Sequence, residues 1–307
     1  MLMKEKHIKR VVQSVLDVPG DAIKNIVATN AGITNESFFI TINDEDFIVR
    51  LPGTGTEELV DRKAEEASLI YGTSIGLNPE TIYFNAQTGI KITRKIEHAQ
   101  MLTPEKAREG KIMKRLIQTF QTLHQANNEM THIFNPFTQI KYYESLIKDT
   151  GIEIHEDVKQ LRNDYLHLRE QYEASSIEIV PCHIDPVAEN ILLDGQEAIH
   201  LIDWEYSGSF DPMWDLATLF QSLQLTEEEE KFFLTHYFER EPTEDELKRL
   251  LLNKIFFNYM WSFWYFYKEV KGETYEDMLH ESWRERVDLV KGYIETFKSL
   301  YAEDTVG

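Results

Sequence analysis

The sequence predicts a mixed α+β fold built from two lobes, and three observations carry this prediction. The chain has 307 residues, more than a single hydrophobic core usually supports. Up to about residue 98, short β-rich runs alternate with turns, whereas helix-period apolar positions dominate from residue 104 onward. We therefore expect a small antiparallel-sheet lobe in residues 1–98 and a larger, mainly helical lobe in residues 99–307.

The N-terminal lobe is expected to contain an antiparallel sheet and one crossing helix. The strands are expected at residues 22–30, 37–42, 46–51, 81–84 and 89–94. The run Asn-Asp-Glu-Asp at residues 43–46 supplies turn chemistry between the second and third strands. Residues 56–75 have the length and charge pattern of a helix.

The C-terminal lobe is expected to be mostly helical. Helix-period patterns occur at residues 104–125, 137–148, 155–172, 226–238, 243–271 and 275–301. Three short runs, 177–180, 191–193 and 199–202, resemble strands and bracket one polar loop. Sequence typical of strands gives way to helix near residues 97–102, where we place the lobe boundary.

Charge and composition exclude some classes of partner. Lys and Arg total 32 against 53 Asp and Glu, which gives a formal net charge of −21. Such a charge repels nucleic acid and anionic bilayers, although it would attract a cationic substrate or simply keep the surface solvated. The apolar run 255–266 is too short to span a membrane and indicates a buried helix. No particular oligomeric state is indicated.

Cysteine usage and the N-terminus both favour a cytoplasmic protein. Cys182 is the only cysteine, so an intrachain disulfide is impossible and a reducing compartment is expected. We expect Cys182 to be a buried apolar residue and not a nucleophile, because no base neighbours it in sequence. The first ten residues lack the apolar stretch of a signal peptide.

The polar loop from His183 to Asn190 is the strongest functional signal. Asp185 lies five residues before Asn190, and Asp203 follows a short apolar run. One carboxylate can receive a hydroxyl proton, while the amide oxygen and the second carboxylate hold Mg²⁺ against the phosphates of a nucleotide. The loop therefore predicts a phosphotransfer site. His183 is expected to be structural and not to transfer protons.

Two further features fit a nucleotide site, and each has a structural alternative. The turn at residues 30–35, which includes Thr34 and Asn35, could cover phosphates or could be an ordinary hairpin turn. Arg50 lies in an apolar strand, and Glu65 lies on the following helix. A buried arginine needs a partner, so the two are either a phosphate-binding cation with its carboxylate or a structural ion pair.

With these motifs in view, the chain resembles the choline/ethanolamine kinases, which share a bilobal, protein-kinase-like fold with aminoglycoside kinases. Within that group it is most similar to bacterial choline kinases that feed phosphocholine decoration of surface glycans. The resemblance runs from the 30–35 turn to Asp211-Pro212-Met213-Trp214-Asp215. It implies ATP and Mg²⁺ as cofactors and choline as the small-molecule substrate, with phosphocholine as product.

The resemblance also implies roles for the nucleotide-site residues. Asp185 corresponds to the catalytic base, and Asn190 and Asp203 correspond to the Mg²⁺ ligands. Arg50, paired with Glu65, would steady the α- and β-phosphates. The hinge following the last strand of the small lobe would bind adenine through backbone groups at Arg94 and Ile96.

Choline carries a quaternary ammonium that is best held by aromatic faces. Trp261 and Trp264 lie three apart on an expected helix, a spacing that by itself is more typical of core packing. They match the choline-binding helix of the bacterial enzymes, and Glu205 and Tyr206 are expected to complete the acceptor site. Met278 stands where relatives often have an aromatic, and Tyr275 or Trp283 could replace that wall.

Two alternative functions stay open at this level. The same phosphotransfer residues would serve another small acceptor, such as ethanolamine, an aminoglycoside or another amino alcohol. A protein of another class, a catalytically silent nucleotide- or choline-binding protein, would keep the fold without turnover. The intact set of Asp185, Asn190 and Asp203 favours an enzyme.

Overall fold

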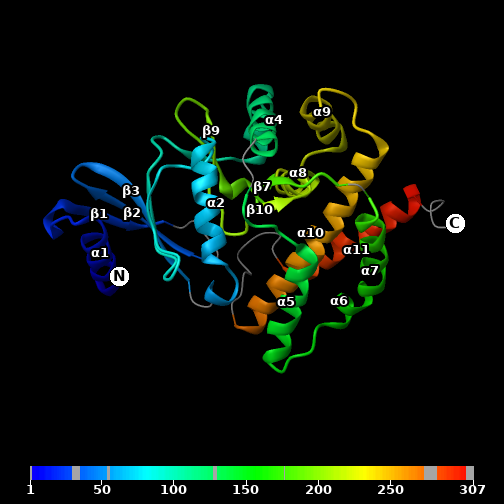
Figure 1. Cartoon of the computed structure of the whole chain (residues 1–307), viewed down its shortest axis with the longest axis horizontal. Coiled ribbons are helices and arrows are strands. Elements are labelled where there is room, and N and C mark those ends of the chain that lie inside the picture. The colour runs from blue at the N-terminus through cyan, green and yellow to red at the C-terminus, as the bar shows by residue number, and fades with distance from the viewer. Residues whose placement is uncertain are drawn as a thin grey trace. The chain divides into compact units, whose positions relative to one another are not determined.

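A computed structural model describes residues 2–29, 35–53, 56–126, 130–175, 177–272 and 282–301 (Figure 1). It has the mixed α+β composition expected from the sequence. The chain forms two compact units: unit 1 comprises Met1–His132 and His183–Ser209, and unit 2 comprises Ile133–Cys182 and Phe210–Gly307. This grouping differs from the lobes expected at residues 1–98 and 99–307, because unit 1 also includes the polar loop and the helices before it.

Unit 1 is built on a five-stranded sheet in the order β1-β2-β3-β5-β4, in which neighbouring strands run antiparallel. The strands are β1 (Ile23–Ala28), β2 (Asn35–Ile42), β3 (Glu45–Pro52), β4 (Thr81–Phe84) and β5 (Lys91–Arg94). Each lies within two or three residues of its predicted position. Arg50 on β3 is the register partner of Lys91 on β5, so both side chains leave the same face of the sheet.

Helix α1 (Leu2–Leu16) was not predicted from the sequence. Ile8 and Val12, one turn apart, are fully buried and join Phe38 and Val49 of the sheet in one core cluster. The apolar face of α1 is narrow and is flanked by charged residues, so the sequence gives a weak amphipathic signal. The role of this face becomes clear only from its packing against the sheet.

Helix α2 (Arg62–Ser74) begins later than the predicted helix at 56–75. Asp61 is the N-cap of this helix, and its carboxylate accepts hydrogen bonds from the backbone N–H groups of Lys63 and Ala64. The short 3₁₀ turn η2 (Thr56–Glu58) occupies the start of the predicted range. The cap places Arg62 and Glu65 in the first turn of the helix.

The remainder of unit 1 frames the polar loop. A small antiparallel sheet runs in the order β6-β8-β9, and β8 and β9 confirm the strands expected around the loop. The elements are η1 (Gly20–Ala22), β6 (Gln100–Met101), α3 (Pro104–Ala107), α4 (Gly110–Gln125), η3 (Ala188–Asn190), β8 (Ile191–Leu193) and β9 (Ile199–Leu201). The end of β9 is tied to the segment that follows α2, since the Leu201 N–H donates to the Leu77 carbonyl at 2.8 Å.

Unit 2 is helical and centres on α10 (Glu244–Val270), which packs against α5, α7, α8 and α11. Its other elements are α5 (Pro136–Asp149), α6 (Glu156–Gln160), α7 (Arg162–Glu173), β7 (Val180–Cys182), α8 (Pro212–Ser222), α9 (Glu227–Tyr237) and α11 (Trp283–Tyr301). Strand β10 (Gly208–Phe210) spans the point where unit 1 gives way to unit 2. Cys182 is buried, and burial raises the pKa of its thiol, as expected for a residue that is not a nucleophile.

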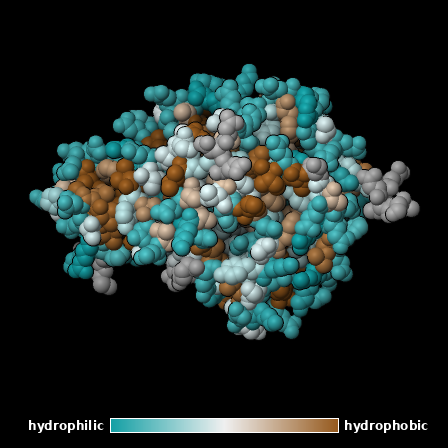
Figure 2. Space-filling model, viewed as in Figure 1, coloured by the Kyte–Doolittle hydropathy of each residue, from teal (hydrophilic) through white to brown (hydrophobic). Residues whose placement is uncertain are grey.

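Helix α8 was missed because it is apolar on nearly every side. All its residues from Met213 to Phe220 are buried, so no amphipathic pattern marks it in the sequence. In the parts of the chain that the structure describes, no helix is both long and apolar enough to cross a lipid bilayer. Hydrophilic residues cover most of the face shown in Figure 2, in keeping with the net charge of −21.

Candidate active site

The polar loop of unit 1 brings Asp185 and Asn190 together. The Asn190 side-chain amide donates to the Asp185 carbonyl at 2.9 Å and to its carboxylate at 3.2 Å. This contact orients Asn190 with its N–H group toward Asp185 and leaves its amide oxygen as a potential metal ligand. The five-residue step therefore closes a loop, as predicted.

His183 fixes the start of this loop through contacts of its ring and its carbonyl group. Its Nε2 atom lies 2.9 Å from the Ile202 carbonyl, and its ring packs edge-on against Trp204 with centroids 4.8 Å apart. The Ser207 hydroxyl donates to the His183 carbonyl at 2.9 Å. These contacts hold Ile184, a β-branched residue, at a φ of 73°. Such strain persists only where the surroundings enforce it, and it recurs at functional sites.

Asp203 follows β9 and has a φ of 64°. Its Oδ1 atom accepts a hydrogen bond from Arg50 Nη1 at 3.0 Å, while its side chain stays 33% exposed. Burial acts to raise the pKa of Asp203, but the positive charges of Arg50 and Lys91 outweigh it and hold that pKa below its ordinary value. Asp203 is therefore a carboxylate at neutral pH, with room for a further ligand.

Arg50 is the central cation of the site. Its Nη2 atom lies 2.5 Å from Glu65 Oε1 and donates to the Gly89 carbonyl at 3.3 Å. The Arg50 side chain is only 5% exposed, so these anchors leave it little freedom. The predicted partnership of Arg50 with Glu65 is present in the structure.

Carboxylates and cations balance one another around Arg50. Oxygens of Glu65, Asp203 and Glu205 all lie within 4.8 Å of one another. The cations that face them in unit 1 are Arg50, Arg62 and Lys91. Because arginine nitrogens already lie within 3.2 Å of each of the three carboxylates, we do not interpret this cluster as a separate metal site.

Glu205, predicted to contact the acceptor, lies within this charged cluster. Its Oε2 atom accepts hydrogen bonds from Asn35 Nδ2 at 3.1 Å and from Arg62 Nη1 at 3.2 Å. Burial raises the pKa of Glu205 to about 7, and the neighbouring Asp203 adds to the rise while the arginines oppose it. The acceptor role of Glu205 and of the half-buried Tyr206 stays a prediction.

The remaining nucleotide-site predictions are placed as follows. Thr34 lies outside the described residues, and Asn35 begins β2. The Arg94 backbone N–H donates to the Glu80 carbonyl at 2.9 Å, so that N–H is not available to adenine. Contacts of adenine with the Arg94 carbonyl and with Ile96 stay predictions.

The predicted choline-binding tryptophans lie in unit 2, on α10. Trp261 and Trp264 meet edge to face with ring centroids 5.6 Å apart. Their exposed fractions are 7% and 3%, so the pair is nearly enclosed. Met278 and Tyr275 lie outside the described residues, whereas Trp283 begins α11 and packs edge-on against Phe266 on α10.

Sequence reasoning did not single out Arg62 and Lys91. Arg62 lies one helical turn before Glu65, a spacing that places both on one face of α2 and could have indicated the pair. Lys91 has no such local signal, because it meets Glu65, at 3.8 Å, only through the register of β5 against β3.

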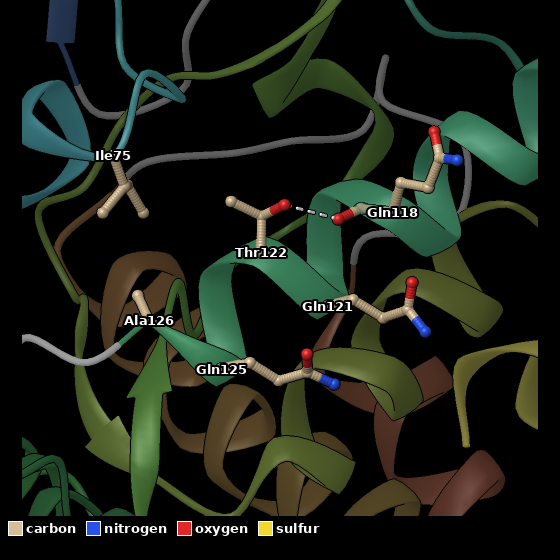
Figure 3. A pocket seen from close by; sticks show the side chains of 6 residues that line it. All are labelled: Ile75, Gln118, Gln121, Thr122, Gln125 and Ala126. Atoms are coloured by element: carbon tan, nitrogen blue, oxygen red, sulfur yellow. Dashed lines mark hydrogen bonds between the residues drawn. The ribbon is translucent and has the colours of Figure 1, made fainter. Parts of the chain in front are cut away.

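Unit 1 also carries a surface cavity of about 480 Å³ along α4 (Figure 3). It is lined by Ile75, Gln118, Gln121, Thr122, Gln125 and Ala126. The Thr122 hydroxyl is turned back to the Gln118 carbonyl at 2.8 Å. No lining residue is ionisable, so this cavity offers neither an acid–base group nor a cation for phosphate.

The profile of the choline/ethanolamine kinase family matches residues 26–290. This chain belongs to that family. The choline kinase LicA from Streptococcus pneumoniae is 30% identical in sequence, superposes with a TM-score of 0.79, and the match covers 97% of this chain and 99% of that one. LicA in complex with AMP is 29% identical, with a TM-score of 0.80 over 95% of this chain and 98% of that one.

A curated relative supports the same family membership. Protein LicA from Haemophilus influenzae is 28% identical over 252 residues, which is 80% of this chain and 74% of that protein. An aminoglycoside 2'-phosphotransferase, 16% identical with a TM-score of 0.60, shares the fold alone. The family member described here is thus a small-molecule kinase that binds nucleotide.

Proposed function

We propose that this chain transfers the γ-phosphoryl group of ATP to the hydroxyl of choline, with Mg²⁺ as its metal, and so produces phosphocholine. The observation that carries the proposal is the gathering of Asp185, Asn190 and Asp203 in one compact unit with the Arg50–Glu65 pair. Similarity over nearly the whole chain to a choline kinase supports the choice of acceptor.

The donor set fits Mg²⁺. Asn190 offers an amide oxygen, and Asp203 offers a carboxylate that is ionised at neutral pH, which are ligands that this hard cation prefers. When bound, Mg²⁺ would supply positive charge that offsets the charge of the phosphates.

The side chains of unit 1 would then act as follows. Asp185 accepts a hydrogen bond from the choline hydroxyl and so aligns the hydroxyl oxygen of choline with the γ-phosphorus. A bond forms between these two atoms, the bond from phosphorus to the β–γ bridging oxygen breaks, and ADP leaves with that electron pair. The hydroxyl proton passes to Asp185. Arg50, held by Glu65, offsets charge on the phosphates.

The acceptor's quaternary ammonium would be held by the α10 aromatics. Lys268 Nζ lies 5.5 Å from the Trp264 ring centroid, so choline would have to displace this ammonium or bind at another face of the indole pair. Trp261 adds a second indole, whose plane makes an angle of 75° with that of Trp264. Ring faces suit choline because a quaternary ammonium has no N–H donor.

Ethanolamine is the second candidate acceptor, because the family profile covers both substrates. Phosphate transfer from labelled ATP to choline, ethanolamine and an aminoglycoside decides between them. We expect kcat/KM to be highest for choline. A preference for another acceptor would replace choline in the proposal, and nucleotide binding without turnover on any acceptor would contradict it.

A cytoplasmic location is part of this proposal. ATP is available there, and the single buried Cys182 suits a reducing compartment.

A further inference from the structure

Arg62 is a buried arginine that the phosphotransfer chemistry described above does not use. It stands at the first position of α2 and is 9% exposed. Its Nη1 atom is shared between Glu65 Oε2 at 2.6 Å and Glu205 Oε2 at 3.2 Å. Burying a guanidinium is costly, so its contribution must come from the charges of the two carboxylates that it neutralises.

Glu205 depends on Arg62 more than the other carboxylates do. Glu65 has Arg50 at 2.5 Å as well as Arg62, and Asp203 has Arg50 at 3.0 Å. The Arg50 nitrogen nearest to Glu205 is 3.6 Å away, beyond a good hydrogen bond. Without Arg62, the buried Glu205 would keep, among the residues that the structure describes, only the neutral amide of Asn35 as a hydrogen-bond donor, and it would compete for Arg50.

Competition for Arg50 matters because its Nη1 atom already serves Asp203. Asp203 keeps its second oxygen for a metal, but Arg50 Nη1 has to turn from Asp203 Oδ1 toward the phosphates when nucleotide binds, while Nη2 stays anchored to Glu65. If Glu205 had no arginine of its own, it would attract Arg50 Nη1 and keep it from turning toward the phosphates. We infer that Arg62 is a positioning residue, which engages Glu205 so that Arg50 stays free for the phosphates; this inference rests on the proposed function.

The turn between β4 and β5 fixes both arginines in these roles. Gly89 has a φ of +69°, and its carbonyl accepts the hydrogen bond from Arg50 Nη2. A Cβ at this position would lie 2.9 Å from Arg62 Nε and 2.7 Å from Pro52 Cγ. The backbone at Gly89 therefore packs closely against Arg62, while its carbonyl anchors Arg50.

The test compares nucleotide affinity in Arg62→Met, Glu205→Gln and the double variant, by calorimetric titration with MgADP and no acceptor. It is run at about pH 9, well above the raised pKa of Glu205, so that this carboxylate is ionised. Arg62→Met should weaken binding about tenfold. The double variant should bind within about threefold of Glu205→Gln, because removing both partners leaves no unpaired charge. Arg108→Met, an exposed arginine of unit 1, is the matched control.

Two outcomes overturn the inference: Arg62→Met binding MgADP as tightly as Arg108→Met, or a double variant binding no more tightly than Arg62→Met. A purely structural role predicts the second outcome, since Glu205→Gln would not repair a packing defect. If Arg62→Met does not fold, Arg62→Gln, which also removes the charge, takes its place with the same criteria. Because no acceptor is present, a failure here is distinct from a failure of the choline assignment.

Discussion

Asp203 in unit 1 and Asp211 in unit 2 are both aspartates held by an arginine, yet their surroundings differ sharply. Asp211 is fully buried, and each of its oxygens has two partners. Oδ1 accepts from the Met213 N–H and Arg249, and Oδ2 accepts from the Tyr172 hydroxyl and the Asn253 amide. Every acceptor position is satisfied, as expected of a structural carboxylate that caps α8.

Asp203 presents the opposite case. Its side chain is 33% exposed, and Arg50 supplies the one hydrogen bond to its carboxylate among the described residues. Burial raises the pKa of Asp211, whereas nearby cations hold the pKa of Asp203 below its ordinary value. An ionised carboxylate that can still accept hydrogen bonds, such as Asp203, is suited to binding a ligand. A carboxylate whose oxygens are all hydrogen-bonded within the protein, such as Asp211, is suited to stabilising the fold.

Substituting Asp203→Asn is the strongest test of this contrast. We expect kcat to fall by about 10³-fold or more, because the proposed Mg²⁺ ligand loses its charge. The free energy of unfolding should change by less than about 1 kcal/mol, since Asp203 is partly exposed. Steady-state kinetics and urea denaturation measure the two quantities. Near-normal turnover would remove Asp203 from the site.

Asp211→Asn should give the reverse result. It leaves Arg249, whose side chain is only 11% exposed, without its counter-charge. Breaking a buried pair in this way costs about 3–5 kcal/mol. Urea denaturation should show this loss, while KM for ATP in the folded fraction stays within about twofold of wild type. Unchanged stability would mean that Asp211 is not the structural counterpart proposed here.

A smaller effect is expected at the acceptor aromatics. Trp261→Leu keeps apolar bulk but removes the indole face, so KM for choline should rise by up to about thirtyfold, equivalent to about 2 kcal/mol, with KM for ATP nearly unchanged. Trp214→Leu, a fully buried tryptophan on α8 in the same unit, is the control and should lower stability without a selective change in choline KM. Equal effects of both variants on choline KM would assign Trp261 to the core.

Gly72→Ala should have the smallest effect and tests how rigidly Asp203 is held. A Cβ on Gly72 would lie 2.7 Å from the indole of Trp204, the residue after Asp203. Overpacking of this kind costs about 1–3 kcal/mol. Gly292→Ala, where nothing lies within 4 Å of the added Cβ, should be neutral or slightly stabilising. Equal unfolding midpoints for the two variants would show that the Trp204 ring can shift to admit the added Cβ without a measurable loss of stability.

The contacts that sequence reasoning found are those with a local signal. Asp185 and Asn190 are five residues apart on one loop, so chain geometry alone brings them together. Arg50 lies in an apolar strand, and such a charge requires an opposite partner, which identified Glu65 on the next helix. The antiparallel sheet followed from alternation and turn residues.

The contacts that escaped prediction depend on register and on burial from all sides. Lys91 approaches Glu65 only because β5 pairs with β3 in one register, and the sequence carries no mark of that register. Helices α1 and α8 were missed because their burial depends on the elements that cover them.

The amino-acid order was enough to predict phosphotransfer chemistry, because Asp185 and Asn190 lie five residues apart on one loop and Asp203 follows the next short strands. Tertiary structure alone decided how the charges are shared: which arginine holds Glu205, which holds Asp203, and which carboxylate is left with open acceptors. Charge balance in a buried cluster depends on distances between residues far apart in the chain, and folding sets those distances.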